Sequence, residues 1–153
     1  MTDRGTSTPV GVSRVRVRYA ETDQMGVAYY ANYLVWFEVA RTDWLRNTGW
    51  SYRAMEADGT SLPVIESHCE YRKAAQYDDE LAIHTRATLL SPVRIRFDYD
   101  VQRVDQPLAI ATGYTVHAAI DTAGRPCRLP SRVRAMLQGR TADPAGPAST
   151  IQG

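Results

Sequence analysis

The sequence is poor in cysteine and has no long hydrophobic run. Its two cysteines, Cys69 and Cys127, are far apart and form no Cys-x-x-Cys pair, which argues against a structural zinc site and against a disulfide framework. No run of about eighteen apolar residues occurs, and residues 1–12 contain an acid and an early arginine but no apolar core. The sequence therefore predicts neither membrane insertion nor a signal peptide, and we expect a cytoplasmic protein.

The chain also lacks an excess of charge of either sign. Its formal net charge is +1 at pH 7, whereas general nucleic-acid binders usually carry a basic imbalance, so we expect no nucleic-acid partner. Lysine is nearly absent, because Lys73 is the single lysine among 18 basic residues. A compositional bias of the genome explains this preference, although the planar fork of arginine also suits phosphate recognition.

Motifs that mark several enzyme classes are missing. The sequence has no Gly-x-Ser-x-Gly elbow and no phosphate-binding glycine loop. Its three histidines, His68, His84 and His117, occur in separate segments without a His-x-His or His-x-x-x-His spacing. A metal site of His68, Glu70 and His84 can be drawn, but the spacing does not favour it. We expect neither a metal nor another cofactor.

What the chain does contain is the apolar content of one soluble domain. Its 153 residues are 44% apolar and 23% charged, which is ordinary for a domain with a substantial core. Both ends are rich in Gly, Pro, Ser and Thr. We therefore expect mobile tails at residues 1–11 and 140–153 around a single domain of residues 12–139.

Hydrophobic periodicity predicts a strand and then a helix in the first third of the chain. Valine and arginine alternate in VRVRYA, residues 15–20, as in a strand with one wet face. Residues 30–47 carry apolar side chains at helical spacing around most of the helix, so we expect other structure to surround it, and Gly49 ends it. Glu38 and Arg41 are spaced for an i, i+3 ion pair with a structural role, and Arg41 points toward the apolar side, where it needs a buried acceptor.

Strand patterns dominate the remaining sequence, and short turn-like segments separate them. The predicted strands are residues 62–72, 80–90, 93–104 and 108–120. A short helix follows in PSRVRAMLQG, beginning at Pro130 or Ser131 and ending at Gly139. Strands joined by such short turns pair antiparallel. The sequence therefore predicts an α+β domain in which a curved antiparallel sheet of about five strands wraps a single long helix.

The segment ETDQMGVAYYANYLVWFE, residues 21–38, joins the first strand to the helix. Asp23 precedes the N-terminus of the helix, where the first backbone N–H groups have no intrahelical partner. Such donors can hold an oxyanion while a nearby carboxylate acts as a base or a nucleophile, the pair that thioester hydrolysis needs. A lone aspartate beside a glycine is, however, also a common turn or cap residue.

The stretch VRYAETDQMGVAYYANYLVWFEVARTDWLR, residues 17–46, resembles the signature of the hot-dog-fold acyl-CoA thioesterases. This family includes 4-hydroxybenzoyl-CoA thioesterase and the thioesterases associated with the bacterial Tol-Pal system. A weaker resemblance continues through YDDELAIHTRATLL, RIRFDYDV and GRPCRLP to about residue 135. The resemblance implies a hot-dog fold, an acyl-CoA substrate, and a homodimer or homotetramer with active sites at the dimer interface.

The resemblance also implies the site residues. Asp23 matches the catalytic aspartate of the family, the backbone N–H of Tyr30 lies where the thioester carbonyl is polarised, and Gly26 lets the chain turn between them. Tyr19 matches a tyrosine of the family's site. Many members have histidine in place of Tyr30, and because tyrosine is no ready base at neutral pH, more of the work falls on Asp23. Whether Asp23 attacks the thioester carbon or activates a water stays open.

A CoA substrate needs cations for its phosphates. Family members present arginine or lysine at places that match, by rough position, Arg94, Arg96, Arg125 and Arg128. A second candidate pair is Arg72 and Lys73. The same side chains would also serve as solvated edges of strands.

Hot-dog domains also act as non-catalytic acyl-CoA sensors and as dehydratases. No helix-turn-helix segment flanks this domain, and the loop-helix region lacks the histidine that a dehydratase would use. We therefore predict a thioester hydrolase that releases a carboxylic acid and CoA, with a sensor or an acyl-carrier-protein thioesterase as the alternatives. The aromatic residues Tyr29, Tyr30, Tyr33 and Trp36 permit an aryl or a short aliphatic acyl group, or they belong to the helix core.

Overall fold

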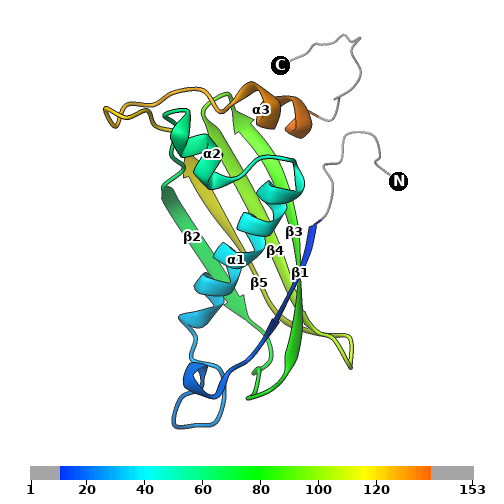
Figure 1. Ribbon diagram of the computed structural model, residues 1–153. Coiled ribbons are helices and arrows are strands. Elements are labelled where there is room, and N and C mark those ends of the chain that lie inside the picture. Colours follow the sequence, from blue (N-terminus) through cyan, green and yellow to red (C-terminus); the bar gives the residue numbers. More distant parts are fainter. Residues whose placement is uncertain (1–10, 139–153) are drawn as a thin grey trace.

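The computed structural model describes residues 11–138 as a curved sheet with one long helix lying across it (Figure 1). The strands are β1 (Gly11–Arg16), β2 (Val64–Tyr71), β3 (Glu80–Ser91), β4 (Arg94–Arg103) and β5 (Leu108–Ala118). The helices are the 3-10 turn η1 (Tyr19–Glu21), α1 (Asn32–Asn47), α2 (Tyr52–Ala57) and α3 (Ser131–Leu137). Apart from Gly11, the predicted tails lie outside the described residues, as does Gly139.

The five strands form one sheet in the order β1-β3-β4-β5-β2, and every neighbouring pair is antiparallel. This confirms the predicted α+β architecture with an antiparallel sheet around one long helix. Strands β1 and β2 are the two edges, and β2 is exposed along nearly its whole length. Helix α1 packs against β1 and β3, while α2 and α3 lie near the end of the sheet toward which α1 runs (Figure 1).

Helix α1 buries the residues that the helical spacing places on one side: Tyr33, Trp36, Phe37, Ala40, Trp44 and Leu45. The ring of Phe37 stacks on Tyr99 of β4, with centroids 4.2 Å apart and planes within 4°. Gly113 of β5 makes this close approach possible, because a Cβ atom there would lie 2.7 Å from the Phe37 ring. The helix ends as predicted, since Gly49 follows it with a φ of +85°.

The start of α1, the extent of the first strand and the presence of α2 differ from the prediction. Helix α1 begins at Asn32 rather than residue 30, because the amides of Asn32 and Tyr33 bond to carbonyls three residues earlier in a tighter turn. The first strand ends at Arg16, and part of the predicted strand forms η1. Helix α2 was not predicted, although the Ser51 side chain caps it by accepting the Ala54 amide at 3.0 Å.

The prediction that other structure surrounds α1 holds for only one side of the helix in the single chain. Leu34, Val35 and Val39 on α1 are 41%, 51% and 38% exposed. The reason is geometric, because the sheet covers one side of the helix and leaves the other side open. An apolar face therefore remains uncovered on the same molecule that carries the exposed edge strand β2.

Arg41 points into the fold as its position on the helix predicts. Burial raises the pKa of Tyr52 to about 12 and also raises that of Tyr99, and the nearby Arg41 guanidinium opposes both shifts. These hydroxyls supply the polar surroundings that Arg41 was predicted to need. The predicted pair of Arg41 with Glu38 does not form among the described side chains, and the i, i+3 ion pair present on α1 joins Arg46 to Asp43 instead.

Candidate functional site

The loop between η1 and α1 folds into a tight turn at Asp23. The Asp23 amide donates to the Val27 carbonyl at 2.9 Å, and the Gly26 amide donates back to the Asp23 carbonyl at 3.0 Å. Gly26 has a φ of +81°, a conformation that favours glycine, so it turns the chain as predicted. This turn lies in the loop that leads into α1.

The Asp23 carboxylate uses one of its oxygens in this turn. Its Oδ1 accepts the amides of Met25 at 2.8 Å and Val27 at 3.4 Å, so the residue does fill the turn role that its sequence context allows. Its Oδ2 accepts no hydrogen bond from any described residue. The half-buried side chain is thus held in place with one oxygen left for other chemistry.

A second turn of the same construction shows what is particular to Asp23. Asp121 accepts the amides of Ala123 and Arg125 through its Oδ1, both at 2.9 Å, and Gly124 has the same φ of +81° as Gly26. The Asp121 turn follows β5, at the opposite end of the sheet. The turn itself is therefore a general device. Asp23 differs in that the 16-residue helix α1 begins nine residues later, whereas the helix after Asp121 is the seven-residue α3.

The free backbone donors at the N-terminal end of α1 precede the helix itself, because the amides of Asn32, Tyr33 and Leu34 donate to carbonyls three residues earlier. The N-cap of α1 is Ala31, which has no side chain able to cap the helix. The Tyr30 amide donates no hydrogen bond to a described residue, and the Tyr30 carbonyl is held by the Tyr71 hydroxyl at 3.2 Å and the Tyr33 amide at 3.3 Å. A helix start without a side-chain cap is a site at which an oxyanion or other anion can be held.

Tyr71, at the end of β2, is a candidate site residue that the sequence did not reveal. Its ring makes edge contacts with Tyr33 at 5.0 Å and Tyr30 at 6.4 Å. Burial is the largest of the effects that raise the pKa of Tyr71 to about 12, so its hydroxyl stays a hydrogen-bond donor at neutral pH. The contact joins residues 41 positions apart, and no local pattern around Tyr71 signals it.

Tyr19 is placed less favourably than the resemblance implies. Its side chain is 78% exposed and makes an edge contact with Tyr77 at 5.8 Å. The contribution of Tyr19 to the turn is its backbone carbonyl, which accepts the Thr22 amide and hydroxyl. No contact joins the Tyr19 ring to Asp23 or to Tyr30 among the described residues.

The six candidate CoA-binding cations do not lie together. Arg72 and Lys73 follow β2 and so lie near Tyr30 and its contact with Tyr71. Arg94, Arg125 and Arg128 lie near the other end of the sheet, where the Ala119 amide bonds to the Val93 carbonyl and the Cys127 amide to the Ala119 carbonyl. Seven residues of β4 separate Arg94 from the level of Tyr71, which at about 3.3 Å per residue is roughly 23 Å.

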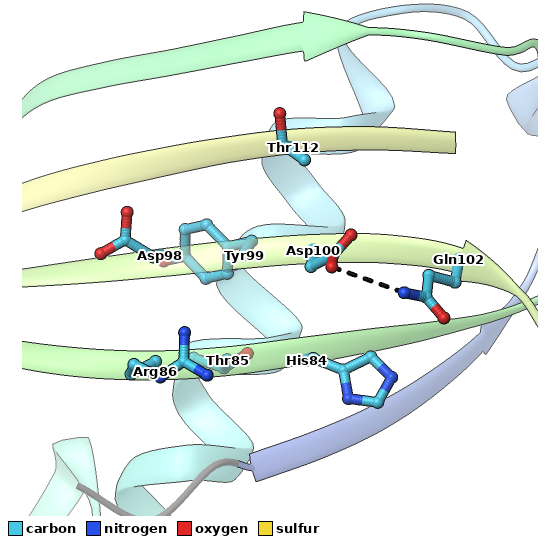
Figure 2. Close-up of a pocket in the computed structure, with 8 residues that line it drawn as sticks. All are labelled: His84, Thr85, Arg86, Asp98, Tyr99, Asp100, Gln102 and Thr112. Carbon is cyan, nitrogen blue, oxygen red and sulfur yellow. Dashed lines mark hydrogen bonds between the residues drawn. The ribbon is translucent and has the colours of Figure 1, made fainter. Parts of the chain in front are cut away.

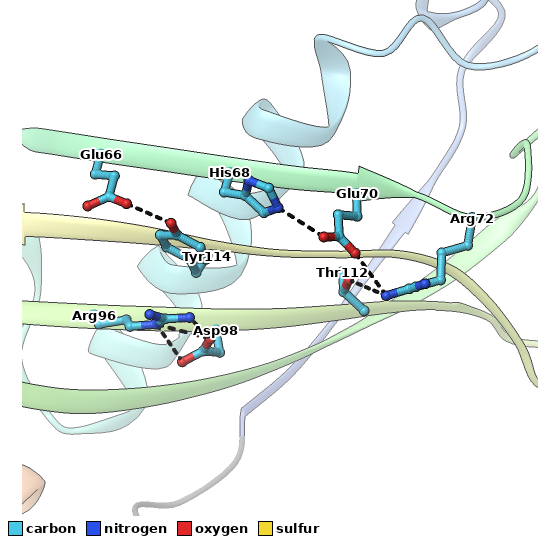
Figure 3. Close-up of polar contacts among 8 residues, drawn as sticks. All are labelled: Glu66, His68, Glu70, Arg72, Arg96, Asp98, Thr112 and Tyr114. Carbon is cyan, nitrogen blue, oxygen red and sulfur yellow. Dashed lines mark hydrogen bonds and ion pairs between the residues drawn. The ribbon is translucent and has the colours of Figure 1, made fainter.

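Arg96 and Arg72 already have carboxylate partners on the outer face of the sheet, the face opposite α1 (Figure 3). Arg96 pairs with Asp98 at 3.0 Å and lies 3.9 Å from the centre of the Tyr114 ring. Arg72 pairs with Glu70, also at 3.0 Å. By contrast, the side chains of Lys73, Arg94, Arg125 and Arg128 are exposed and pair with no described residue. These four remain available to a ligand.

The outer face also holds a hollow of about 410 Å³. Figure 2 shows its lining on β3, β4 and β5, with α1 behind the sheet: His84, Thr85, Arg86, Asp98, Tyr99, Asp100, Gln102 and Thr112. The hollow shares no lining residue with the Asp23 turn. Within residues 11–138, no group of three or more His, Cys, Asp and Glu side chains is placed to hold a metal ion.

Comparison with known proteins places the chain in a family. The family model described as Thioesterase-like superfamily matches residues 17–137. The chain belongs to the thioesterase-like superfamily. The predicted hot-dog fold and the predicted class of thioester hydrolase are thereby confirmed, while the individual site residues stay predictions.

Relatives within the thioesterase-like superfamily span different shares of the chain. The acyl-CoA thioesterase YbgC of Haemophilus influenzae is 33% identical over 138 residues, which are 88% of this chain and 96% of that protein. The putative acyl-CoA thioesterase YneP of Bacillus subtilis is 45% identical over 76 residues, so that match spans 50% of this chain and 55% of that protein. Among solved structures, the DHNA-CoA thioesterase of Staphylococcus aureus has a TM-score of 0.78 and 30% identity, covering 87% of this chain and 89% of that one.

No helix within residues 11–138 is long and apolar enough to cross a membrane.

Proposed function

We propose that the protein hydrolyses an acyl-CoA thioester to a free carboxylic acid and CoA at a site formed by Asp23 and the N-terminus of α1. The observation that carries the proposal is the free Oδ2 of Asp23, held in a rigid turn just before a helix start without a side-chain cap. Relatives named acyl-CoA thioesterase support the class of substrate. The edge-packed rings of Tyr30, Tyr33 and Tyr71 fit an aromatic acyl group.

The geometry favours Asp23 as the nucleophile. Its Oδ2 adds to the thioester carbon, the carbonyl oxygen takes up negative charge beside the Tyr30 N–H, and the C–S bond breaks to release CoA thiolate, which takes a proton from water. The resulting mixed anhydride has Oδ1 as its aspartyl carbonyl oxygen, already bonded to the Met25 and Val27 amides. Water then adds to the Asp23 carboxyl carbon, loses its proton to solvent, and frees the carboxylic acid.

A thiol-release assay with a panel of aromatic and aliphatic acyl-CoAs tests the activity. We expect Asp23→Asn to lower kcat by at least about 10²-fold. The matched control is Asp121→Asn, which makes the same chemical change in the same kind of turn and should leave kcat nearly unchanged. Normal turnover in Asp23→Asn, or equal losses in both variants, would refute the assignment of Asp23.

Isotope labelling tests the proposed route through the aspartyl carbon. In one turnover in H₂¹⁸O, nucleophilic attack followed by hydrolysis at the aspartyl carbon puts the label into Asp23 and leaves the first acid released unlabelled. Mass spectrometry of the product and of the peptide that contains Asp23 reads both positions. Label in the first product and none in the peptide would show that water adds to the acyl carbon and would refute the route through the aspartyl carbon.

The same panel distinguishes the alternative functions. An acyl-CoA sensor would bind acyl-CoAs without releasing thiol from any of them. An acyl-carrier-protein thioesterase would release thiol from the acylated carrier protein much faster than from the matching acyl-CoA. The free Oδ2 of Asp23 favours hydrolysis over sensing, because binding alone does not require it.

We further propose that the working molecule is a dimer joined through the β2 edges. Val64 and Ile65 on β2 are 46% and 48% exposed, and α1 exposes Val35 in addition. A bare edge strand beside uncovered apolar side chains is a surface on which a second copy can continue the sheet. Light scattering on a sizing column should give a dimer, or a tetramer if a second interface forms, and Ile65→Asp should shift the population toward monomer.

Antiparallel pairing of two β2 strands would also reunite the candidate cations with Asp23. It sets the start of one β2 beside the end of the other, so the end of one chain that holds Arg125 and Arg128 faces the Asp23 end of its partner. The substrate then does not have to span the roughly 23 Å that separate the two ends of the sheet within one chain. On this arrangement each active site takes its catalytic aspartate from one chain and its phosphate-binding arginines from the other.

A further inference from the structure

Glu21 carries a buried carboxylate immediately before the Asp23 turn. The residue is 8% exposed, and carboxylates are rarely this buried unless several donors surround them. Its Oε1 accepts the Arg18 amide at 2.8 Å. Its Oε2 accepts the indole N–H of Trp36 at 3.3 Å and the Arg18 guanidinium at 3.4 Å. Because the Arg18 side chain is 74% exposed, the amide and the indole are the contacts that fix the carboxylate.

The backbone of Glu21 makes the same connection. Its carbonyl accepts the Tyr29 amide and the Asn32 side-chain amide, each at 2.8 Å. Glu21 is therefore bonded to residues on both sides of the loop: Arg18 before it, and Tyr29, Asn32 and Trp36 after it. Through these bonds, Glu21 joins the two ends of the loop that contains Asp23.

The relation of Asp23 to the helix start depends on these bonds. Asp23 lies two residues after Glu21, and the Tyr30 amide lies one residue after Tyr29, whose own amide bonds to the Glu21 carbonyl. Trp36 belongs to the second turn of α1, so its bond to the Glu21 carboxylate orients the helix relative to the turn. If either connection is lost, the loop can move while the Asp23 turn itself stays intact.

We propose that Glu21 is a positioning residue that sets the Asp23 carboxylate against the N-terminus of α1. Its effect on catalysis rests on the proposed function, whereas its effect on the loop does not. It touches no substrate and acts through Asp23 and the Tyr30 amide. Displacing reacting groups by about 1 Å can cost roughly 10²-fold in rate without weakening binding, so losing the bonds of Glu21 should affect kcat rather than KM.

The test replaces the Glu21 carboxylate by an amide of the same shape. All three groups bonded to the carboxylate are donors, so Glu21→Gln turns an NH₂ toward at least one of them. We expect kcat to fall by roughly 10- to 100-fold with KM changed less than about threefold. Asn32→Ala removes one backbone contact of Glu21 from a half-buried surface position, folds more readily, and should give a smaller loss in the same direction.

The matched control is Asp43→Asn. Asp43 accepts the Ser13 hydroxyl at 2.7 Å and ties the other end of α1 to β1, so this variant also removes the charge of an α1 anchor, but away from the loop. It should leave kcat and KM unchanged. A fall in kcat as large as that of Glu21→Gln would show that any loosening of α1 has this effect and would overturn the proposal.

Hydrogen–deuterium exchange supplies a readout that does not depend on activity. Peptides covering residues 22–31 should exchange faster in Glu21→Gln and Asn32→Ala than in the wild type. In Asp43→Asn and Asp23→Asn the same peptides should exchange at the wild-type rate. Unchanged exchange of this loop in Glu21→Gln, or a raised KM with normal kcat, would overturn the proposal. If the wild type cleaves no thioester, the proposed function fails, and the exchange data alone decide whether Glu21 holds the loop.

Discussion

His117 of β5 should make the fold sensitive to acid between about pH 6.5 and pH 4. The side chain is fully buried, with 0% exposure. Its Nδ1 lies 2.9 Å from the Leu62 carbonyl, so it carries the proton, and its Nε2 accepts the Thr115 hydroxyl at 2.9 Å. The Thr115 oxygen in turn lies 2.7 Å from the Tyr99 hydroxyl, so the network is complete with a neutral imidazole.

Burial lowers the pKa of His117 to about 4 from an ordinary value of 6.5, and the charge of Arg41 adds to this shift, while the bond to Leu62 opposes it. Because the folded state resists protonation, the stabilisation is complete above pH 6.5, where both states are neutral. It is lost as the pH falls toward 4, since the unfolded chain binds the proton first. A shift of about 2.5 units corresponds to roughly 3 kcal/mol in total, of which about 2 kcal/mol is lost between pH 7 and pH 5.

Urea unfolding at fixed protein concentration and at several pH values measures this loss. In His117→Gln the free energy of unfolding should be lower at pH 7, and its decrease from pH 7 to pH 5 should be smaller than in the wild type by about 2 kcal/mol. His68→Gln, which replaces an exposed histidine of β2, controls for the loss of a histidine as such. An equally steep decrease in His117→Gln and in the wild type would refute the reasoning.

Two other predictions concern the dimer and the core. If each site combines Asp23 of one chain with arginines of its partner, mixing Asp23→Asn with the double variant Arg125→Ala/Arg128→Ala should restore about a quarter of the wild-type kcat/KM after subunit exchange. The reason is that half of the dimers then contain one chain of each variant, and each such dimer has one intact site. No recovery, once native mass spectrometry has verified the exchange, would show that the arginines act within their own chain. Gly113→Ala should lower the free energy of unfolding by about 1–3 kcal/mol, because the new Cβ would lie 2.5 Å from the backbone oxygen of His68 and 2.7 Å from the Phe37 ring. An unchanged urea midpoint would contradict the close packing described.

The architecture could be predicted because each of its main signals is local. Alternating strands joined by short turns can pair only antiparallel, and the apolar spacing of residues 32–45 defines the buried side of α1. Gly49 marked the end of the helix for the same reason, since its positive φ is a property of one residue. The start of α1 was placed too early because the aromatic pattern continues through Tyr29 and Tyr30, whose backbone forms a tighter turn that hydrophobicity does not report.

The candidate site was less predictable because its contacts join distant parts of the chain. The loop position of Asp23 and the turn at Gly26 could be predicted from residues within five positions of each other. The bond from Tyr71 to the Tyr30 carbonyl and the separation of the arginines into two ends depend on how β2 and β5 pair. Glu21 was passed over because an acid in a polar loop predicts exposure, whereas the fold buries it under Trp36.

The exposed strand β2 accounts for both the uncovered helix and the divided cations. A hot-dog sheet that ended at β2 would leave apolar side chains of α1 in water, which costs about 25 cal/mol for each Å² that a partner could cover. The phosphates of a CoA whose thioester lies at the Asp23 turn would also be out of reach of Arg125 and Arg128 of the same chain. Both problems disappear if a second copy adds its own β2 in antiparallel register, because one contact then covers the apolar surface and brings the arginines to the turn. A monomer that retained wild-type kcat/KM, for instance in Ile65→Asp, would separate these two observations and show that the arginines near the far end of the sheet have no part in binding CoA.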